Sequence, residues 1–306
     1  MQRSTTASAE ANSPLPAGPA RWLLPTALLF PTALTLIYFV WMASAPGAIQ
    51  RVVFGVAKLA QFLLPIVWWQ GRRQATLAHS DTARFRSTLS RAAPASMAPS
   101  SPFSAPTRRP ESHPAGPPTA PPSVWYPSPC PSRRPSALRG SLLGLGMGVV
   151  MAALMLLGAA GLEAAGLFAP AIPTIRLKLA GVGVQTAAEF AALACFYCLA
   201  HSLLEEYYFR WFLWRLCDEA RPGLPAHLLA AVGFMSHHVV VLAFYFGGLH
   251  PMTWLGSLAV AIAGLAWSWL YEATGRLWPS WIAHILADAA IFGFGYHLLT
   301  FPITSP

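Results

Sequence analysis

Charged residues are scarce in this chain of 306 residues. Asp, Glu, Lys and Arg together make up 10% of the sequence, whereas an ordinary soluble domain carries about 25%. Hydrophobic residues make up 55%. This balance excludes an ordinary soluble protein and predicts an all-α, polytopic bundle of helices in a membrane.

Windows of about 20 apolar residues predict seven transmembrane helices. The expected spans are 22–43, 49–70, 141–162, 180–204, 227–246, 253–271 and 279–300. The fourth continues beyond its charged residues as far as Arg215. No small-residue cleavage pattern follows the first span, so we interpret it as a true transmembrane helix and not as a signal peptide.

The stretch 71–139 lacks the apolar periodicity that a folded core needs, and it is crowded with proline, serine and alanine. We therefore predict a disordered linker there. The chain then has four parts. They are an N-terminal tail at 1–21, a two-helix membrane hairpin at 22–70, the linker at 71–139 and a five-helix membrane domain at 140–306.

Arginine predicts the orientation of the chain in the membrane. The linker holds ten of the 20 basic residues and only two acidic ones, so the positive-inside rule places it in the cytoplasm. The net charge of +9 is explained by this topology and by contact with anionic lipid, and no nucleic-acid signature accompanies it. With 18 Arg against 2 Lys, the composition suggests a GC-rich bacterial genome. The expected location is therefore a bacterial inner membrane.

Three charged residues lie within six positions of the fourth span: Glu205, Glu206 and Arg210. Each costs a few kcal/mol at membrane depth. Glu206 and Arg210 stand four residues apart with the acid first, which favours an ion pair. Glu205 points about 100° away on the helix and is free to act elsewhere, with His201 one turn before it.

Two later spans carry His238 and His284, and Asp288 follows His284 by one helical turn. At about 1.5 Å of rise per residue, Glu205, His238 and His284 lie at a similar depth in the cytoplasmic half of the bilayer. We therefore expect the three spans to bring these groups together in a proton-handling site.

Three short motifs in successive spans carry a resemblance to a known family. They are Glu205-Glu206-x-x-x-Arg210, Phe234-x-x-x-His238 and His284-x-x-x-Asp288. In order and spacing they resemble the motifs of the CAAX-protease and bacteriocin-processing (CPBP or Abi) family of intramembrane endopeptidases. The resemblance covers residues 190–300.

The resemblance implies an enzyme that hydrolyses a peptide bond of a membrane-anchored protein or peptide near the cytoplasmic face, without a cofactor. Glu205 and His238 would activate water, and His284 with Asp288 would stabilise the oxyanion. Glu206 and Arg210 would support the first motif.

Two departures from the family pattern leave roles open. Asp288 stands where asparagine is frequent, and an ionised aspartate is a poor oxyanion donor. Asp288 is therefore either protonated or a group that orients His284. His237 directly precedes His238 and is an alternative to it as the working histidine.

Other functions fit the same residues. A Glu/His/His set also suits catalytic zinc, although the sequence contains no His-Glu-x-x-His helix. The cluster could instead belong to a non-catalytic immunity or helper protein, to a polar network that only joins helices, or to a proton-coupled transporter. No inverted repeat supports the transporter.

Small and aromatic residues predict packing instead of chemistry. Gly140, Gly144 and Gly148 recur every four residues, as at close contacts between membrane helices. Five tryptophans mostly near span ends predict an interfacial belt: Trp254, Trp267, Trp269, Trp278 and Trp281.

Overall fold

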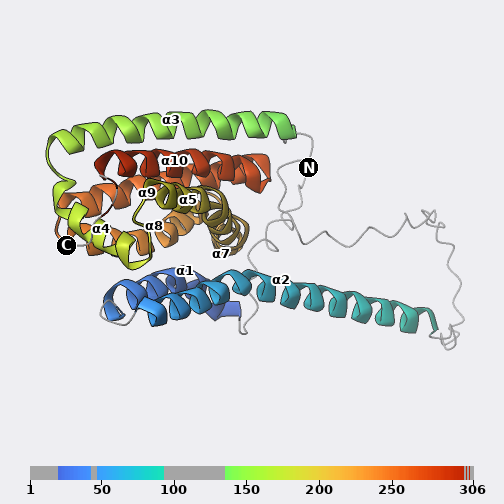
Figure 1. Ribbon diagram of the computed structural model, residues 1–306. Coiled ribbons are helices and arrows are strands. Elements are labelled where there is room, and N and C mark those ends of the chain that lie inside the picture. Colours follow the sequence, from blue (N-terminus) through green and yellow to red (C-terminus); the bar gives the residue numbers. More distant parts are fainter. Residues whose placement is uncertain (1–19, 43–46, 93–134, 300, 302, 304–306) are drawn as a thin grey trace, which may run out of the picture. The chain divides into compact units, whose positions relative to one another are not determined.

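The computed structural model describes residues 20–42, 47–92, 135–299, 301 and 303 (Figure 1). Within these residues the regular structure is entirely helical and includes no strand. The predicted all-α fold is confirmed for the part of the chain that is described.

Among the described residues, seven helices are long and apolar enough to cross a membrane, which agrees with the expected number. They run Trp22–Trp41, Val52–Gln74, Ala137–Ala164, Ala187–Ala220, Leu224–Phe246, Pro251–Thr274 and Leu277–Leu298. The chain is an integral, multi-pass membrane protein.

The α-helices of the described residues are the following. They are α1 (Ala20–Leu36), α2 (Gly47–Ala92), α3 (Ala137–Ala164), α4 (Ile172–Gly181), α5 (Ala187–Cys195), α6 (Ser202–Glu206), α7 (Arg215–Ala220), α8 (Leu224–Phe246), α9 (Pro251–Thr274) and α10 (Leu277–Leu298). A π-helical segment at Ile37–Trp41 follows α1, two more at Phe196–His201 and Tyr207–Trp214 join α5 to α6 and α6 to α7, and a 3₁₀ turn lies at Ala169–Ala171.

The fourth span begins at Ala187, so the predicted start at 180 is wrong. The chain ends α4 at Gly181 and turns before α5, which a capping box opens. The Thr186 hydroxyl accepts the backbone N–H of Glu189, and the Glu189 carboxylate accepts the N–H groups of Gln185 and Thr186 at 2.8 and 2.9 Å. Glu189 thereby satisfies N–H groups at the start of α5.

The chain divides into two compact units, one of residues 1–65 with 134–306 and one of residues 66–133. In the second unit α2 continues to Ala92, so residues 71–92 are helical where the sequence predicted the start of a disordered linker. No proline occurs between Pro65 and Pro94, and the backbone can therefore stay helical. The remainder of the predicted linker, 93–134, lies outside the described residues.

Helix α3 lies along α10 (Figure 1), and its glycine stripe makes the contact. Gly140, Gly144 and Gly148 are buried. A Cβ atom on Gly144 would overlap the backbone of Pro279, and one on Gly148 would stand 2.9 Å from the Cα atom of Ala283. Glycine therefore lets the two backbones approach more closely than any side chain would permit, as the spacing predicted.

Replacing Gly144 by valine should separate α3 from α10 and lower the free energy of unfolding by about 1–3 kcal/mol, because the extra atoms meet backbone that cannot rotate away. The measurement is thermal unfolding in detergent. Gly146→Val is the matched control, since a Cβ atom at Gly146 meets no atom within 4 Å. Equal melting temperatures for the two variants would contradict the close contact.

Candidate active site

The two glutamates of the first motif lie on a single α-helical turn between two π-helical segments, and Arg210 lies in the second of these segments. The α6 turn carries both glutamates, and the wider turns at Phe196–His201 and Tyr207–Trp214 adjoin it on either side. Insertions of this kind change the direction of the side chains around them and are frequent at functional sites. No feature of the hydropathy pattern predicted them.

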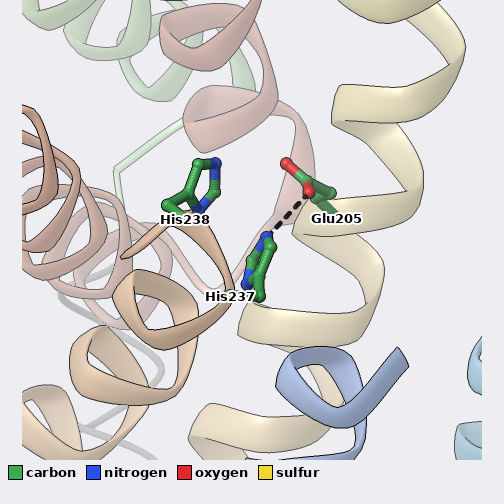
Figure 2. A group of neighbouring side chains, drawn as sticks. All are labelled: Glu205, His237 and His238. Atoms are coloured by element: carbon green, nitrogen blue, oxygen red, sulfur yellow. Dashed lines mark ion pairs between the residues drawn. The ribbon is translucent and has the colours of Figure 1, made fainter. Parts of the chain in front are cut away.

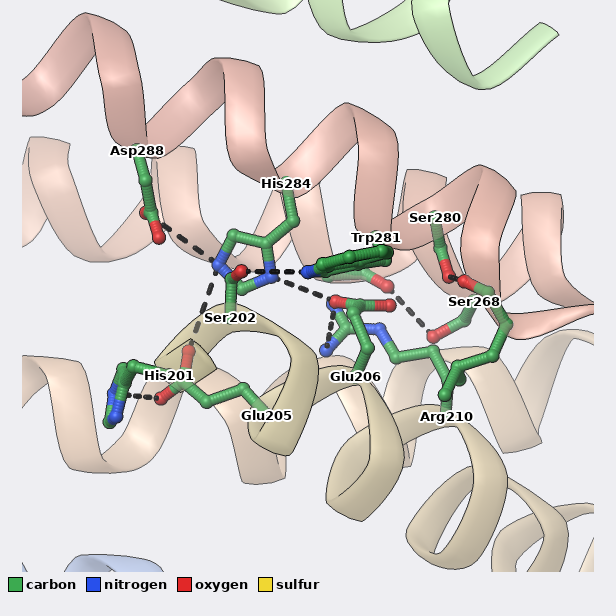
Figure 3. Close-up of polar contacts among 12 residues, drawn as sticks. His201, Ser202, Glu205, Glu206, Arg210, Ser268, Ser280, Trp281, His284 and Asp288 are labelled. Carbon is green, nitrogen blue, oxygen red and sulfur yellow. Dashed lines mark hydrogen bonds and ion pairs between the residues drawn. The ribbon is translucent and has the colours of Figure 1, made fainter. Parts of the chain in front are cut away.

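Glu205 is the point at which side chains of several helices meet. Its side chain is buried, with 5% exposed. One oxygen, Oε1, lies 3.2 Å from His201 Nε2 and 3.5 Å from His237 Nε2. The other, Oε2, lies 3.7 Å from His284 Nε2. Figure 2 shows the contact with His237, and Figure 3 shows those with His201 and His284.

The histidines of α8 differ in what they contact. His238 Nδ1 donates to the carbonyl oxygen of Phe234 at 2.9 Å, and because a carbonyl only accepts, its Nε2 is left as an acceptor. His237 contacts Glu205 directly and stacks on Phe209 at 5.4 Å. The sequence assigned the working role to His238 with His237 as the alternative, and the structure brings both to the glutamate.

Glu206 and Arg210 form the ion pair that their spacing predicted, with Arg210 Nη1 3.2 Å from Glu206 Oε1. Both side chains are almost fully buried, at 0% and 1% exposed. The same Oε1 accepts a hydrogen bond from His284 Nδ1 at 2.9 Å (Figure 3). Glu206 therefore joins the fourth span to α10.

Aromatic rings pack against the guanidinium group of Arg210. The Arg210 guanidinium lies 4.6 Å from the Phe234 ring centroid and 5.0 Å from that of Trp267. Trp267 also stacks on His284, with centroids 4.1 Å apart and ring planes at 21°. Cation–π contacts in a dry site contribute about 2 kcal/mol.

One tryptophan departs from the predicted interfacial belt, and a second makes hydrogen bonds near the start of α10. Trp267 is 3% exposed and lies inside the bundle, where it contacts the arginine and the histidine of the site. Trp281 Nε1 lies 3.1 Å from both the Leu199 carbonyl oxygen and the Ser202 hydroxyl. The position of a tryptophan relative to the span ends predicted neither contact. An indole ring can turn toward the inside of the bundle, where its face contacts a cation or its N–H donates to an acceptor.

His284 presents its second nitrogen to two acids. Nε2 lies 3.7 Å from Glu205 and 3.6 Å from Asp288 Oδ1. These separations are longer than a hydrogen bond, so Nε2 is not committed to either carboxylate. Asp288 is one helical turn from His284, as the motif spacing requires, and its side chain is 18% exposed.

Glu205, His237 and His238 each offer one ligand atom, and these atoms lie within 4.8 Å of one another. This set differs from the one predicted for zinc, because it uses both histidines of α8. His238 has the outer hydrogen bond to a carbonyl that zinc-bound histidines usually make. His237 lacks it, since its buried Nδ1 has no hydrogen-bond partner among the described residues. The residues can hold a metal, but one ligand is not oriented for it.

Lys58 is a residue that the sequence analysis did not single out. It lies on α2, which precedes the motif region by more than a hundred residues, and its Nζ lies 5.6 and 5.7 Å from the ring centroids of Phe54 and Phe62. The sequence does contain one signal for this residue, which is its position. A charged lysine in the middle of an apolar span raises the free energy of membrane insertion.

Other titratable residues lie apart from this cluster. Glu272 Oε2 lies 3.0 Å from His227 Nε2, whose other nitrogen accepts from Trp214 Nε1 at 3.1 Å. His297 lies 3.1 Å from Glu163. These contacts join pairs of helices and involve no group of the Glu205 site.

Comparison with known proteins identifies the region that carries the cluster. Residues 187–290 match the family of type II CAAX prenyl endopeptidases, Rce1-like. This segment, about a third of the chain, is similar to that family. The match spans all three motifs, from Glu205 to Asp288, and the family supports peptidase activity. No curated protein and no solved structure matches significantly.

Proposed function

We propose that this protein is an intramembrane endopeptidase that hydrolyses its substrate without a metal, using Glu205 as the general base. One observation carries the proposal: the buried Glu205 carboxylate is contacted by His201, His237 and His284, which lie on the fourth span, α8 and α10. A glutamate surrounded by imidazoles in a peptidase family is suited to moving a proton to and from water.

The attacking water would lie between Glu205 and Nε2 of His238. Two hydrogen bonds of about 2.8 Å that meet at a tetrahedral water span about 4.6 Å, and the ligand atoms of these two residues lie within 4.8 Å of each other. Glu205 takes a proton from the water as its oxygen attacks the scissile carbonyl. His238 Nε2 accepts the second hydrogen bond and orients the water. His237 is a positioning residue, because it contacts Glu205 and not the water.

His284 would stabilise the oxyanion through Nε2. Since Nδ1 already donates to Glu206, a second N–H at Nε2 requires the imidazolium form. That positive charge would lie among the three carboxylates of Glu205, Glu206 and Asp288. Asp288 then acts by orienting and balancing His284, and donation to the oxyanion stays with the histidine.

The substrate would be a membrane-anchored protein or peptide, and the family description points to tails that end in a prenylated CAAX sequence. The basic residues of 71–139 support a cytoplasmic linker and a bond cleaved near the cytoplasmic face. The composition supports a bacterial inner membrane. The test of the function is loss of cleavage in Glu205→Gln. Retained cleavage would exclude Glu205 as the general base, whereas no cleavage by the wild-type protein would favour a helper protein or a transporter.

Zinc-dependent hydrolysis is a second candidate, favoured by the grouping of Glu205, His237 and His238. With three protein ligands, zinc would hold the water in its fourth position and lower its pKa. In that case His237 and His238 are equivalent ligands. The metal-free mechanism instead assigns them unequal roles.

The two histidine variants decide between these candidates. In the metal-free mechanism, His238→Gln should lower kcat/KM about a hundredfold or more, because it removes a group that contacts the reacting water. His237→Gln should lower it about tenfold, because Glu205 keeps His201 and His284. Equal losses in both variants, together with zinc in the wild-type protein and none in either variant by mass spectrometry, would establish the zinc enzyme instead.

A further inference from the structure

Among the described residues, the shortest polar contact of the Glu205 carboxylate comes from a histidine outside the three motifs. His201 Nε2 lies 3.2 Å from Oε1 (Figure 3). The nitrogens of His237 and His284 lie farther away, at 3.5 and 3.7 Å. Only the first of these distances falls within the usual range of an N–H···O hydrogen bond. An ionised carboxylate accepts and does not donate, so Nε2 of His201 carries the hydrogen at this contact.

The two oxygens of Glu205 have different surroundings. Oε1 is shared by His201 and His237. Oε2 has His284 Nε2 as its neighbour, at a distance longer than a hydrogen bond. The same Nε2 is the group that the proposed mechanism directs at the oxyanion. Oε2 therefore lies beside the carbonyl under attack and keeps the lone pairs that are needed to take a proton.

Aromatic packing fixes the ring of His201. This residue is the last of the π-helical segment Phe196–His201. Its ring centroid lies 4.8 Å from that of Tyr197 and 6.4 Å from that of Phe196. The Tyr197 ring in turn lies 5.5 Å from that of Phe292 on α10. A donor whose ring is supported in this way by its own span, and through Tyr197 by α10, can fix the orientation of the carboxylate that it contacts.

We propose that His201 is a positioning residue that holds Oε1 of Glu205, so that Oε2 is the oxygen that takes the proton from water. The proposal rests on the proposed peptidase function and assigns a role within it to a residue outside the motifs. As the water oxygen bonds to the scissile carbonyl carbon, one of its protons passes to Oε2. That proton then moves to the leaving amine as the C–N bond breaks. His201 keeps its own proton throughout and contacts neither the water nor the substrate.

The test compares His201→Phe with His201→Gln in the full-length protein in nanodiscs, by cleavage of a membrane-anchored fluorogenic peptide. Phenylalanine keeps a ring beside Tyr197 and loses the donor. Its kcat should fall by about tenfold to a hundredfold, the cost of a base displaced by about 1 Å, while KM stays within about twofold. Glutamine carries an N–H donor as many bonds from the backbone as Nε2 of histidine, so it should recover about half of the wild-type kcat.

Two further variants serve as controls. His297→Phe removes a histidine that lies 3.1 Å from another glutamate, Glu163, away from the cluster, and it should keep the wild-type kcat. His201→Asn carries the same amide as His201→Gln one bond nearer the backbone, where it does not reach Glu205. It should therefore be as slow as His201→Phe, and it replaces that variant in the comparison if the phenylalanine disturbs folding.

Three results would overturn the proposal. They are a wild-type kcat in His201→Phe, equal losses of kcat in His201→Gln and His201→Asn, and a loss that appears only in KM. The second would mean that the imidazole itself, and not a donor, is required, and the third would make His201 a contact of the substrate. Each of these rejects the inference while the wild-type protein still cleaves the peptide. If the wild-type protein does not cleave it, the peptidase function itself fails, and this inference fails with it.

Discussion

The Glu205→Gln variant should lose proteolysis almost completely, with kcat/KM falling by about a hundredfold to ten-thousandfold, the range for a lost general base. Glutamine keeps the size of the side chain and its capacity to accept hydrogen bonds from the surrounding histidines. It cannot take a proton from water. The expected loss is therefore in kcat, while KM for a membrane-anchored peptide should change little.

The measurement is cleavage of a fluorogenic peptide by the purified protein in nanodiscs, with Glu163→Gln as the control. Glu163 is also a glutamate paired with a histidine, but the partner is His297, away from the cluster. Its variant should keep wild-type activity. Wild-type turnover in Glu205→Gln, with correct folding shown by its melting temperature, would reject the peptidase mechanism.

The Arg210→Met variant should be strongly destabilised, by about 3–5 kcal/mol, because it leaves the Glu206 carboxylate buried without its ion pair. The remaining hydrogen bond from His284 compensates only in part. Methionine also loses the guanidinium contacts with Phe234 and Trp267. The free energy of unfolding can be measured by denaturant titration in detergent.

A second substitution shows that the lost stability comes from the unpaired charge. The double variant Arg210→Met with Glu206→Gln removes both charges and should recover part of the loss, as a double-mutant cycle would quantify. Arg221→Met, at an exposed arginine after α7, should unfold like the wild type. A double variant no more stable than Arg210→Met alone would show that ring contacts, and not the charge, account for the stability.

Local sequence signals were sufficient for the spans and for the first motif. Hydropathy depends on composition within one segment, so the seven spans could be found without knowing their neighbours. The Glu206–Arg210 pair depends only on helical periodicity. Boundaries were less certain, since the capping box at Thr186 delays the fourth span and a run without proline carries α2 beyond residue 70.

Contacts between helices could not be predicted from these local sequence signals. Residues 237 and 238 have the same chemistry and adjacent positions, and only the rotation of α8 against the fourth span directs His237 to the glutamate and His238 Nδ1 to the Phe234 carbonyl. Trp267 belonged to a predicted belt, yet its ring stacks on His284.

The sequence by itself determined the class of this protein: a seven-span helical membrane protein with one acidic motif and two histidine motifs at similar depths. Periodicity and hydropathy are properties of a single segment, so they can be read before the tertiary structure is known. Only the tertiary structure decided which atoms face one another. It directs Glu205 to the histidines and joins Glu206 to Arg210 and His284, because these relations depend on how separate helices rotate and pack.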